Sequence, residues 1–357
     1  MSVSAKKPFR FAVTGTGDIA GFYVGHFNAR GPEQREGVEF AGAWNRTVGK
    51  GRAFVEKHGG RFYGSLDELL GDSGVDAVVN LTSPAAHAKI TRRALDAGKH
   101  VLSEKPLALD LETARELAAL AVSKKVTLAS APFILLGDNQ RRVKELLESG
   151  RIGRPVSATA ELFHGRAETW HPNPEQFYVE GAGPVLDVGP YPVSLLLYWF
   201  GPVSGVQGMF DIAVPERTDL SGRAFKVRVF DNGVALLRFR NGVIARIAFS
   251  FANSNTSHHG LEIQGDRGSL SLASIFAAGG ELRVSNRDSS QWDEKSGTPG
   301  PWPASGVDWS GGIMELARAV REGREPVNSA RLALDTLEVL FAINRAGSSG
   351  QTVCLGK

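Results

Sequence analysis

The sequence predicts an α/β protein whose first third forms a doubly wound parallel sheet. Residues 9–14 read as a short buried strand, and the run Gly15-Thr-Gly-Asp-Ile-Ala20 turns it directly into a helix. Strand and helix patterns then alternate to residue 131, which requires right-handed crossovers between parallel strands. Beyond residue 135 this alternation ends, and between residues 226 and 272 strands follow one another through short turns. We therefore expect two domains, residues 1–132 and residues 133–357, the second an α/β domain with an open, largely antiparallel sheet.

Composition and charge narrow the class of protein. The 357 residues suit two domains of roughly 150 residues each. Forty-one basic and 38 acidic residues leave a net charge of +3, and no run of Lys or Arg exceeds two, so we expect no nucleic-acid partner. The single cysteine, Cys354, excludes an internal disulfide, and no spacing of His with carboxylates predicts a metal site. Residues 1–8 lack an apolar signal core and no stretch approaches eighteen apolar residues, so the sequence predicts a cytoplasmic protein that binds no membrane.

Within the first domain, several helices have a recognisable start or end. Ser65 and Glu68 form a capping box, Pro84 occupies the first position of a helix that Gly98 ends, and Asp110 can cap the next helix. The expected strands cover residues 38–44, 61–63, 77–81, 100–103 and 127–131. The expected helices cover residues 19–29, 48–58, 84–97 and 110–124, with one or two further turns after Ser65.

In the second domain, paired Asn-Gly residues indicate hairpin turns. Asn232-Gly233 and Asn241-Gly242 each supply two residues that tolerate positive φ, so we expect tight turns there. The expected strands cover residues 156–162, 226–230, 235–240 and 243–251, with a further pair within 260–272. The expected helices cover residues 138–149, 188–200, 312–321 and 331–345, and a long loop covers 285–306.

The turn after the first strand is suited to a dinucleotide. Gly15 permits the tight bend, Gly17 lets the backbone approach a pyrophosphate, and Ala20 lets the helix pack on the strand. The N–H groups at the helix start, from Asp18 and Ile19, would face the phosphates. Glycine-rich turns also bind other mononucleotides and S-adenosylmethionine, or only close a corner, so the turn alone leaves these alternatives open.

The end of the second strand, Trp44-Asn45-Arg46-Thr47, lies where a dinucleotide fold holds the adenosine ribose. It has no Asp or Glu to accept from both ribose hydroxyls, whereas Arg46 offers a guanidinium fork for a 2′-phosphate. This favours NADP over NAD as the cofactor. The alternative is that Arg46 only stacks on adenine while Asn45 binds the 2′-hydroxyl.

Two further strand ends carry polar residues where parallel sheets place their ligands. Thr82 and Pro84 follow one strand, and Glu104 and Lys105 follow the next. We expect Lys105 to lie near the reactive end of the cofactor. Pro106 restricts the direction in which Lys105 projects, and the bond between them is a candidate for the cis form. The alternative is an ordinary surface lysine after a strand.

A second glycine-rich loop, Gly181-Ala-Gly-Pro-Val-Leu-Asp187-Val-Gly-Pro-Tyr191, leads into an apolar helix. Asp187 and Tyr191 are four residues apart and would share a helical face if the turn is regular. By spacing alone, Asp187 is explained as well by a helix cap, and Tyr191 by a half-buried core aromatic.

Three motifs in this order, Gly-x-Gly-x-x-Ala, Glu-Lys-Pro and Gly-x-Gly-x-x-x-Asp-x-Gly-x-Tyr, resemble the Gfo/Idh/MocA family of oxidoreductases over essentially the full length. The resemblance implies a Rossmann domain that binds NADP or NAD, with Lys105 at the nicotinamide and Asp187 and Tyr191 completing the site. His87 matches a family Pro-x-x-His and would line the nicotinamide pocket, unless it is a satisfied half-buried histidine. Most members carry His in place of Tyr191. The Tyr variant is similar to the glucose-fructose oxidoreductase, dimeric dihydrodiol dehydrogenase and NADP-linked xylose dehydrogenase branches.

The chemistry that this resemblance implies is hydride transfer at a carbon that bears a hydroxyl, whose proton must go to a base. Tyr191 would act as that base, because an ammonium at Lys105 lowers the pKa of the phenol. Asp187 would orient Lys105 or hold a neighbouring hydroxyl. His171 and Tyr178, in the irregular stretch before the second glycine-rich loop, are expected to contact the substrate.

We expect a dehydrogenase or reductase of carbohydrate-like small molecules, namely sugars, polyols or related vicinal diols. Two alternatives stay open: an enzyme that retains its cofactor through the cycle, and a non-catalytic sensor that binds NADP and a partner protein. His258 and His259, between two strands, could reach the site from the sheet edge. The resemblance also implies a homodimer or homotetramer.

Overall fold

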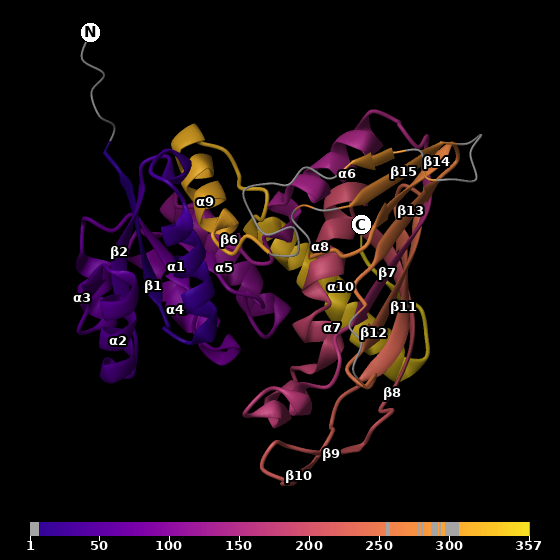
Figure 1. Cartoon of the computed structure of the whole chain (residues 1–357), viewed down its shortest axis with the longest axis horizontal. Helices are drawn as coiled ribbons and strands as arrows, with labels where there is room; N and C mark the ends of the chain where they lie inside the picture. Colours follow the sequence, from indigo (N-terminus) through magenta and orange to yellow (C-terminus); the bar gives the residue numbers. More distant parts are fainter. Residues whose placement is uncertain are drawn as a thin grey trace. The chain divides into compact units, whose positions relative to one another are not determined.

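The computed structural model describes residues 7–254, 258–276, 279, 281–286, 292, 294–296 and 307–356. It divides into two compact units (Figure 1). The first consists of Met1–Phe133 with Asp308–Leu334, and the second of Ile134–Val307 with Asp335–Lys357. The chain therefore leaves the first unit after Phe133 and returns to it for one segment, which the sequence pattern assigns to the second domain.

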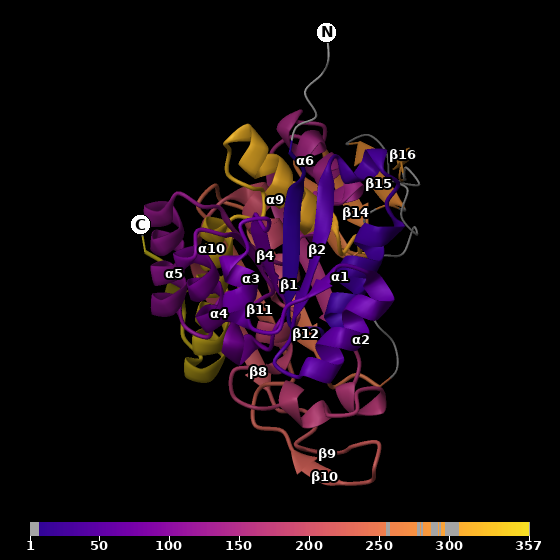
Figure 2. The same ribbon diagram turned by 90° about the vertical axis from the view of Figure 1, so that its left-hand side faces the viewer.

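The first unit is built on a six-stranded sheet in the order β3-β2-β1-β4-β5-β6. Figure 2 shows its central strands β2, β1 and β4 side by side. Every neighbouring pair is parallel, which confirms the doubly wound sheet. The strand order reverses between β1 and β4, and such sheets bind their ligands at the carboxyl ends of the strands at this point. The strands are β1 (Phe9–Thr14), β2 (Val38–Trp44), β3 (Arg61–Phe62), β4 (Ala77–Asn80), β5 (His100–Ser103) and β6 (Leu128–Ser130).

The helices that connect these strands begin where the capping residues predict. The Ser65 hydroxyl accepts from the Glu68 N–H at 3.0 Å, and the Asp110 carboxylate accepts from the Thr113 N–H at 2.7 Å. The helices are α1 (Asp18–Ala29), α2 (Val48–His58), α3 (Leu66–Gly71), α4 (Pro84–Asp96) and α5 (Leu111–Lys124), with a short 3-10 helix η1 (Glu33–Arg35).

The returning segment packs on the first sheet through α9 (Gly311–Glu322). A side chain on Gly312 would come within 3.1 Å of Leu102 in β5, so α9 lies close against this sheet. At the end of α1, the Arg30 guanidinium donates to the Asp308 carboxylate at 2.7 Å. Long-range packing of this kind brings the segment back to the first unit, and no local pattern indicates it.

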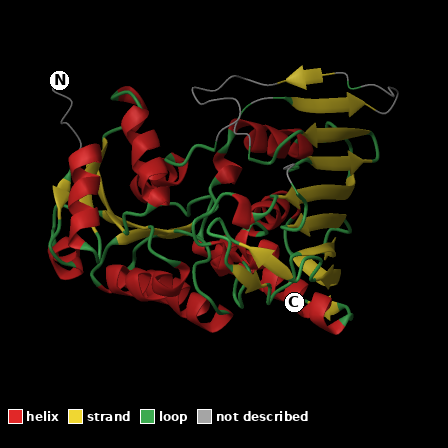
Figure 3. Cartoon of the chain, turned by 60° about the horizontal axis from the view of Figure 1, so that its bottom comes forward, coloured by secondary structure: helices red, strands yellow, loops and turns green. Residues whose placement is uncertain are grey.

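The second unit contains a nine-stranded sheet in the order β16-β15-β14-β13-β7-β12-β11-β8-β17, which Figure 3 shows as a ladder of strands. Among the described strands, β7 and β12 are parallel and the other neighbours are antiparallel, which confirms the open, largely antiparallel sheet. A separate two-stranded sheet pairs β9 (Glu216–Thr218) with β10 (Ala224–Lys226). The strands of the large sheet are β7 (Pro155–Phe163), β8 (Val203–Asp211), β11 (Asn232–Phe239), β12 (Ile244–Ser250), β13 (Leu261–Gly265), β14 (Gly268–Leu272), β15 (Leu282–Asn286), β16 (Glu294–Ser296) and β17 (Val353–Cys354).

Helices of the second unit cover one face of this sheet (Figure 1). Along β11, Ala235 and Leu237 are fully buried, whereas Val234 and Leu236 are 38% and 43% exposed, the period of two expected for one covered face. No helix among the described residues combines the length and the apolar character needed to cross a membrane. The helices are α6 (Asp138–Glu148), α7 (Gly183–Asp187), α8 (Pro190–Phe200) and α10 (Ala330–Ser349), with 3-10 helices η2 (Ile134–Leu136), η3 (Ala167–Thr169) and η4 (Pro174–Phe177).

One predicted hairpin turn is wrong. Asn232 and Gly233 lie within β11, where Gly233 pairs with Phe210 of β8. A side chain on Gly233 would come within 2.2 Å of the Phe210 ring, so this glycine serves a close approach between strands and not a turn. The other expected turn, Asn241-Gly242, does join β11 to β12, and Gly242 has a φ of 92°.

Candidate functional site

The glycine-rich turn after β1 has the backbone geometry that its motif predicts. Gly15 has a φ of 84°, and a side chain there would come within 2.7 Å of the Leu81 carbonyl oxygen. Only glycine fits, because the left-handed backbone and the close approach both disfavour a Cβ. The Gly15 N–H donates to the Trp44 carbonyl at 3.0 Å. The turn is therefore held between the ends of β2 and β4.

The residues after Gly15 fit the phosphates of a dinucleotide. Gly17 is exposed at the N-cap of α1, and a side chain there would have no atom within 4 Å. The first N–H groups of α1, those of Asp18 and Ile19, belong to the groups that a helix start leaves for a ligand. The buried Thr16 hydroxyl has no hydrogen-bond partner in the described part of the chain, and a phosphate oxygen would supply one.

Asn45 and Arg46 follow β2 and differ in their contacts. The Asn45 side chain accepts from the Thr16 N–H at 3.2 Å and donates to the Thr47 carbonyl at 3.0 Å, so it joins the turn to the start of α2. Arg46 is exposed, and among the described residues no hydrogen bond or ion pair engages its guanidinium. Its charge is therefore open to an anionic ligand at this end of the sheet.

His87, one turn into α4, is a buried link between two loops. Its side chain is 1% exposed, and its ring nitrogens lie 2.7 Å from the Pro106 carbonyl oxygen and 2.9 Å from the Thr82 carbonyl oxygen. The structure thus supports the alternative of a satisfied histidine, and it leaves His87 almost no surface toward a nicotinamide. Pro84, the first residue of α4, is exposed.

Glu104 and Lys105 follow β5, the neighbour of β4 in the sheet. The Glu104 carboxylate is buried; it accepts from the Tyr23 hydroxyl at 2.5 Å and from the Lys105 N–H at 3.0 Å. The Lys105 side chain is half-buried, and the Lys105–Pro106 bond has the cis form that the sequence allows. Because β4 and β5 are parallel neighbours, Thr82 and Lys105 follow adjacent strand ends, as expected.

Asp187 and Tyr191 lie at a break between two helices. Asp187 ends α7, and Tyr191 is the second residue of α8, so the regular turn that a shared helical face would need is not formed. Pro190 has no N–H with which to continue the first helix, and it starts the second instead. A side chain on Gly189 would come within 2.1 Å of the Val185 carbonyl oxygen, so the break also requires a glycine. Both Asp187 and Tyr191 remain half-buried.

Two histidines lie close to Tyr191 in the second unit. The Phe276 ring contacts Tyr191 and His259, with centroid distances of 4.9 Å and 4.8 Å. His259 Nε2 lies 3.4 Å from His164 Nδ1. Burial, with the neighbouring His164 and His258, lowers the pKa of His259 to about 4. His259 is thus a neutral imidazole at pH 7, one aromatic ring away from Tyr191.

Tyr178 belongs to a buried polar cluster. Its hydroxyl donates to Glu168 at 2.8 Å and accepts from the Ala167 N–H at 3.0 Å and from Arg217 at 3.1 Å. Arg217 also pairs with Glu168 at 2.8 Å and with Asp231 at 2.5 Å. Burial raises the pKa of the Tyr178 phenol. The side chain is fully buried, so we replace its expected contact with substrate by a structural role.

His171 is half-buried within an aromatic group. Its ring lies 5.3 Å from that of Trp170 and 4.9 Å from that of Phe177, and its Nδ1 accepts from the Asn173 N–H at 2.9 Å. These contacts hold the ring in place, and its role toward a substrate stays a prediction.

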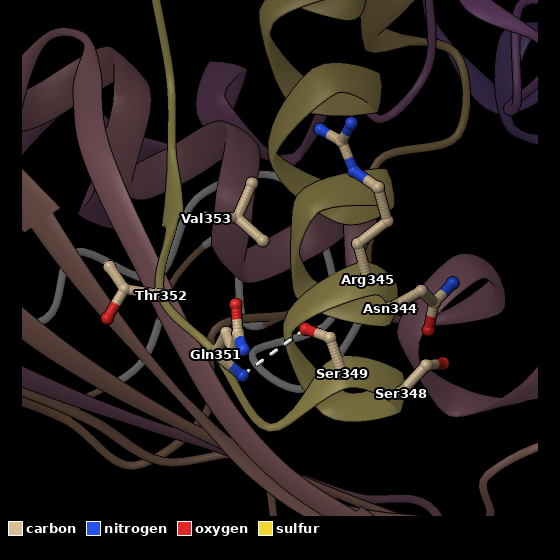
Figure 4. Close-up of a pocket in the computed structure, with 7 residues that line it drawn as sticks. All are labelled: Asn344, Arg345, Ser348, Ser349, Gln351, Thr352 and Val353. Carbon is tan, nitrogen blue, oxygen red and sulfur yellow. Dashed lines mark hydrogen bonds between the residues drawn. The ribbon is translucent and has the colours of Figure 1, made fainter.

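A pocket at the end of α10 contains none of the predicted site residues (Figure 4). The Gln351 N–H donates to the Ser349 hydroxyl at 3.2 Å. With one arginine as its single ionisable group, this lining offers no acid–base pair, and we assign no chemistry to it. The lining residues are Asn344, Arg345, Ser348, Ser349, Gln351, Thr352 and Val353.

Sequence reasoning missed two polar residues that shape the first unit. Asn80, fully buried at the end of β4, donates to the His87 carbonyl at 2.9 Å and to the Thr91 hydroxyl at 3.0 Å, and so anchors α4. Tyr23 lies on the buried stripe of α1, where an aromatic residue reads as core. In the sequence, the single indication of a role for Asn80 or Tyr23 is that each places a polar group at a position expected to be buried.

Comparison with known proteins agrees with both units. Residues 9–131 match the family description "Oxidoreductase family, NAD-binding Rossmann fold", and residues 140–271 match "GFO/IDH/MocA C-terminal domain". A 1,5-anhydro-D-fructose reductase from Ensifer adhaerens is 31% identical over 239 residues, 66% of this chain and 68% of that protein. A dTDP-3,4-didehydro-2,6-dideoxy-alpha-D-glucose 3-reductase from Actinomadura kijaniata is 29% identical over 275 residues, 75% of this chain and 76% of that protein.

The fold is also similar to that of solved structures. An oxidoreductase domain protein from Kribbella flavida superimposes with a TM-score of 0.86 at 22% identity, covering 98% of this chain and all of that one. At this identity the likeness concerns the fold alone.

Proposed function

The chain belongs to the Gfo/Idh/MocA family and is an oxidoreductase with an NAD-binding Rossmann domain, and from that premise we propose an NADP-preferring dehydrogenase or reductase. Its substrate would be a sugar, a polyol or a related vicinal diol. The two curated relatives named above are reductases of sugar derivatives, which supports this substrate class.

The observation that carries the cofactor proposal is the pairing of an open phosphate turn with an exposed cation. Gly17 leaves room for a pyrophosphate, and the Thr16 hydroxyl has no partner among the described residues. Arg46 stands at the end of the neighbouring strand, where a 2′-phosphate would be held, and no acidic side chain follows β2 to bind a ribose diol instead. NADP would therefore gain one charge-assisted contact that NAD lacks.

Three residues would carry the chemistry. The nicotinamide, when bound, supplies a hydride acceptor or donor. Tyr191 would take the proton from the substrate hydroxyl, or return it in the reverse direction. Lys105 would favour the phenolate and stabilise charge on the reacting oxygen, and Asp187 would orient Lys105 or hold a neighbouring hydroxyl. His171 would contact the substrate.

The test is absorbance at 340 nm with NADP and NAD in turn, against aldoses, inositols, polyols and trans-diols. We expect reduction of NADP that disappears in Lys105→Met and falls about 10²- to 10⁴-fold in Tyr191→Phe, with NADPH binding retained. Turnover of Tyr191→Phe within twofold of the wild type would remove Tyr191 from the mechanism. Silence across the panel despite NADPH binding would overturn the dehydrogenase proposal and favour a retained cofactor or a sensor.

Self-association is part of the same proposal. The face of the second sheet that its helices leave uncovered exposes Met209 by 83% and Ile244 by 42%, an apolar surface suited to a second copy of the chain. We expect light scattering to give the mass of a dimer or tetramer, and Met209→Asp to reduce it. A monomeric wild type would contradict this part of the proposal.

A further inference from the structure

We infer that Tyr23, in the helix that begins at the phosphate turn, is a positioning residue for Lys105 and acts through the carboxylate of Glu104. The inference rests on the proposed role of Lys105. Tyr23 carries no part of the motifs that mark the site, and its position on the buried stripe of α1 would suit a phenylalanine equally well for packing.

The Glu104 carboxylate is held at both oxygens. Tyr23 donates to Oε1 at 2.5 Å, and the Lys105 N–H donates to Oε2 at 3.0 Å. The first distance is typical of a hydroxyl that donates to an ionised carboxylate, which is among the stronger hydrogen bonds in proteins. The carboxylate therefore connects the side chain of Tyr23 to the backbone of Lys105.

Burial makes this connection hard to replace. Tyr23 is fully buried and Glu104 is 9% exposed, so little water reaches the carboxylate. A buried carboxylate that loses a donor must find another, take up a proton or move toward solvent. Any of these changes would release the N–H of Lys105, and the direction of the lysine side chain depends on that stretch of backbone.

The ring of Tyr23 is supported independently of its hydroxyl. It lies 5.4 Å from the Phe133 ring and 5.7 Å from the Trp309 ring, both within the first unit. Trp309 also stacks on Phe22 at 5.7 Å. These contacts involve the ring, so Tyr23→Phe should keep this packing and lose the hydrogen bond to Glu104.

The same helix would link cofactor binding to Lys105. Tyr23 lies five residues after Asp18, which is about 7.5 Å along the helix axis. A ligand that holds the start of α1 therefore restrains the helix that carries the Tyr23 hydroxyl. We expect a bound dinucleotide to strengthen the hold on Lys105 through Glu104.

The experiment measures exposure of Lys105 directly, without turnover. The full chain, alone and saturated with NADPH, is labelled with acetic anhydride at fixed pH, and acetylation of Lys105 is quantified by mass spectrometry. Tyr23→Phe and Glu104→Gln are compared with the wild type. The matched control is Tyr63→Phe, which removes another buried tyrosine hydroxyl of the first unit, bonded to Asp72 at 2.9 Å.

We expect Lys105 labelling to rise about tenfold in Tyr23→Phe and in Glu104→Gln, since a hydrogen bond to a buried charge holds this loop closed. Labelling of Lys105 in the double variant of Tyr23→Phe with Glu104→Gln should be no higher than in either single variant, because both changes break the same connection. NADPH should protect Lys105 in the wild type and in Tyr63→Phe, but much less in Tyr23→Phe. Labelling of Tyr23→Phe within twofold of the wild type, or an equal rise in Tyr63→Phe, would overturn the inference. Inactivity of the wild type on every sugar would refute the proposed function and leave this result unaffected.

Discussion

Arg46→Ala tests whether this chain distinguishes NADP from NAD by a single side chain. Arg46 is exposed and, within the described residues, unpaired, so its removal should leave the fold unchanged. Asn45 is a poorer target because it holds the Thr16 N–H at 3.2 Å and the Thr47 carbonyl at 3.0 Å. The matched control is Arg52→Ala, which removes the same charge from α2 at a site where the guanidinium lies 5.0 Å from the Phe62 ring.

The magnitude follows from the kind of bond that Arg46 would make and from the exposure of its side chain. One hydrogen-bonded contact between a guanidinium and a phosphate contributes about 1.5 to 3 kcal/mol, which is roughly ten- to a hundredfold in affinity. Because Arg46 is exposed, we expect the lower part of that range, and a smaller effect in 1 M salt, where the screening length falls to about 3 Å. NADH has no 2′-phosphate, so its Kd should change by less than about twofold.

The assay is titration of purified protein with NADPH and with NADH, followed by nucleotide fluorescence at low salt and in 1 M salt. We expect Arg46→Ala to weaken NADPH binding about tenfold or more and Arg52→Ala to weaken it far less. An equal loss of NADPH and NADH affinity would assign Arg46 to adenine stacking. An equal loss of NADPH affinity in Arg46→Ala and Arg52→Ala would attribute the preference for NADPH to the overall positive charge of this region. Either result would refute a specific contact between Arg46 and the 2′-phosphate.

Three further changes test other parts of the structure. Gly15→Ala places a Cβ within 2.7 Å of the Leu81 carbonyl oxygen at a φ of 84°, so we expect a loss of about 2 kcal/mol or more in the free energy of unfolding, and weaker NADPH binding. Thermal unfolding with and without NADPH checks both effects. An unchanged unfolding midpoint would contradict the geometry. Arg217→Met leaves the buried carboxylates of Glu168 and Asp231 without their cation, so the free energy of unfolding should fall by about 3 to 5 kcal/mol. Urea unfolding, monitored by hydrogen exchange of amides in the second unit, measures this loss. A loss below about 1 kcal/mol would argue against the cluster. The pKa of His259 is lowered to about 4 in the folded state, so as pH falls the unfolded chain takes up a proton at this residue before the folded chain does. The free energy of unfolding therefore decreases as pH falls from about 6.5 toward 4. His259→Asn should make this decrease shallower, and an identical pH profile of stability would exclude a contribution from His259.

Local sequence patterns predicted the first unit closely, and for a local reason. The strand at 38–44 and the helix at 48–58 have the predicted bounds, because apolar runs, caps and glycines specify them within a few residues. The turn at Gly15 was predictable in the same way, since its left-handed backbone and its close approach to β4 both require glycine. Strands that alternate with helices in this way form a parallel sheet, and its crossover connections have one handedness.

Other features depend on residues that are far apart in the sequence. The local sequence predicts a turn at Gly233, but in the fold this residue pairs with β8 and lies against the Phe210 ring. The local sequence also predicts a substrate contact at Tyr178, but in the fold its hydroxyl is buried and bonded to Arg217. The return of residues 308–334 to the first unit has no local signal either, because it depends on packing between surfaces that no short stretch contains.

The sequence by itself therefore determined the type and order of most elements, the phosphate turn and the family, all of which are written in short motifs. Tertiary structure alone decided that His87 is buried between two loops and that Tyr23 reaches the Glu104 carboxylate. Each of these depends on the distance between side chains that lie on different elements. Spacing along the chain sets that distance only within one regular element.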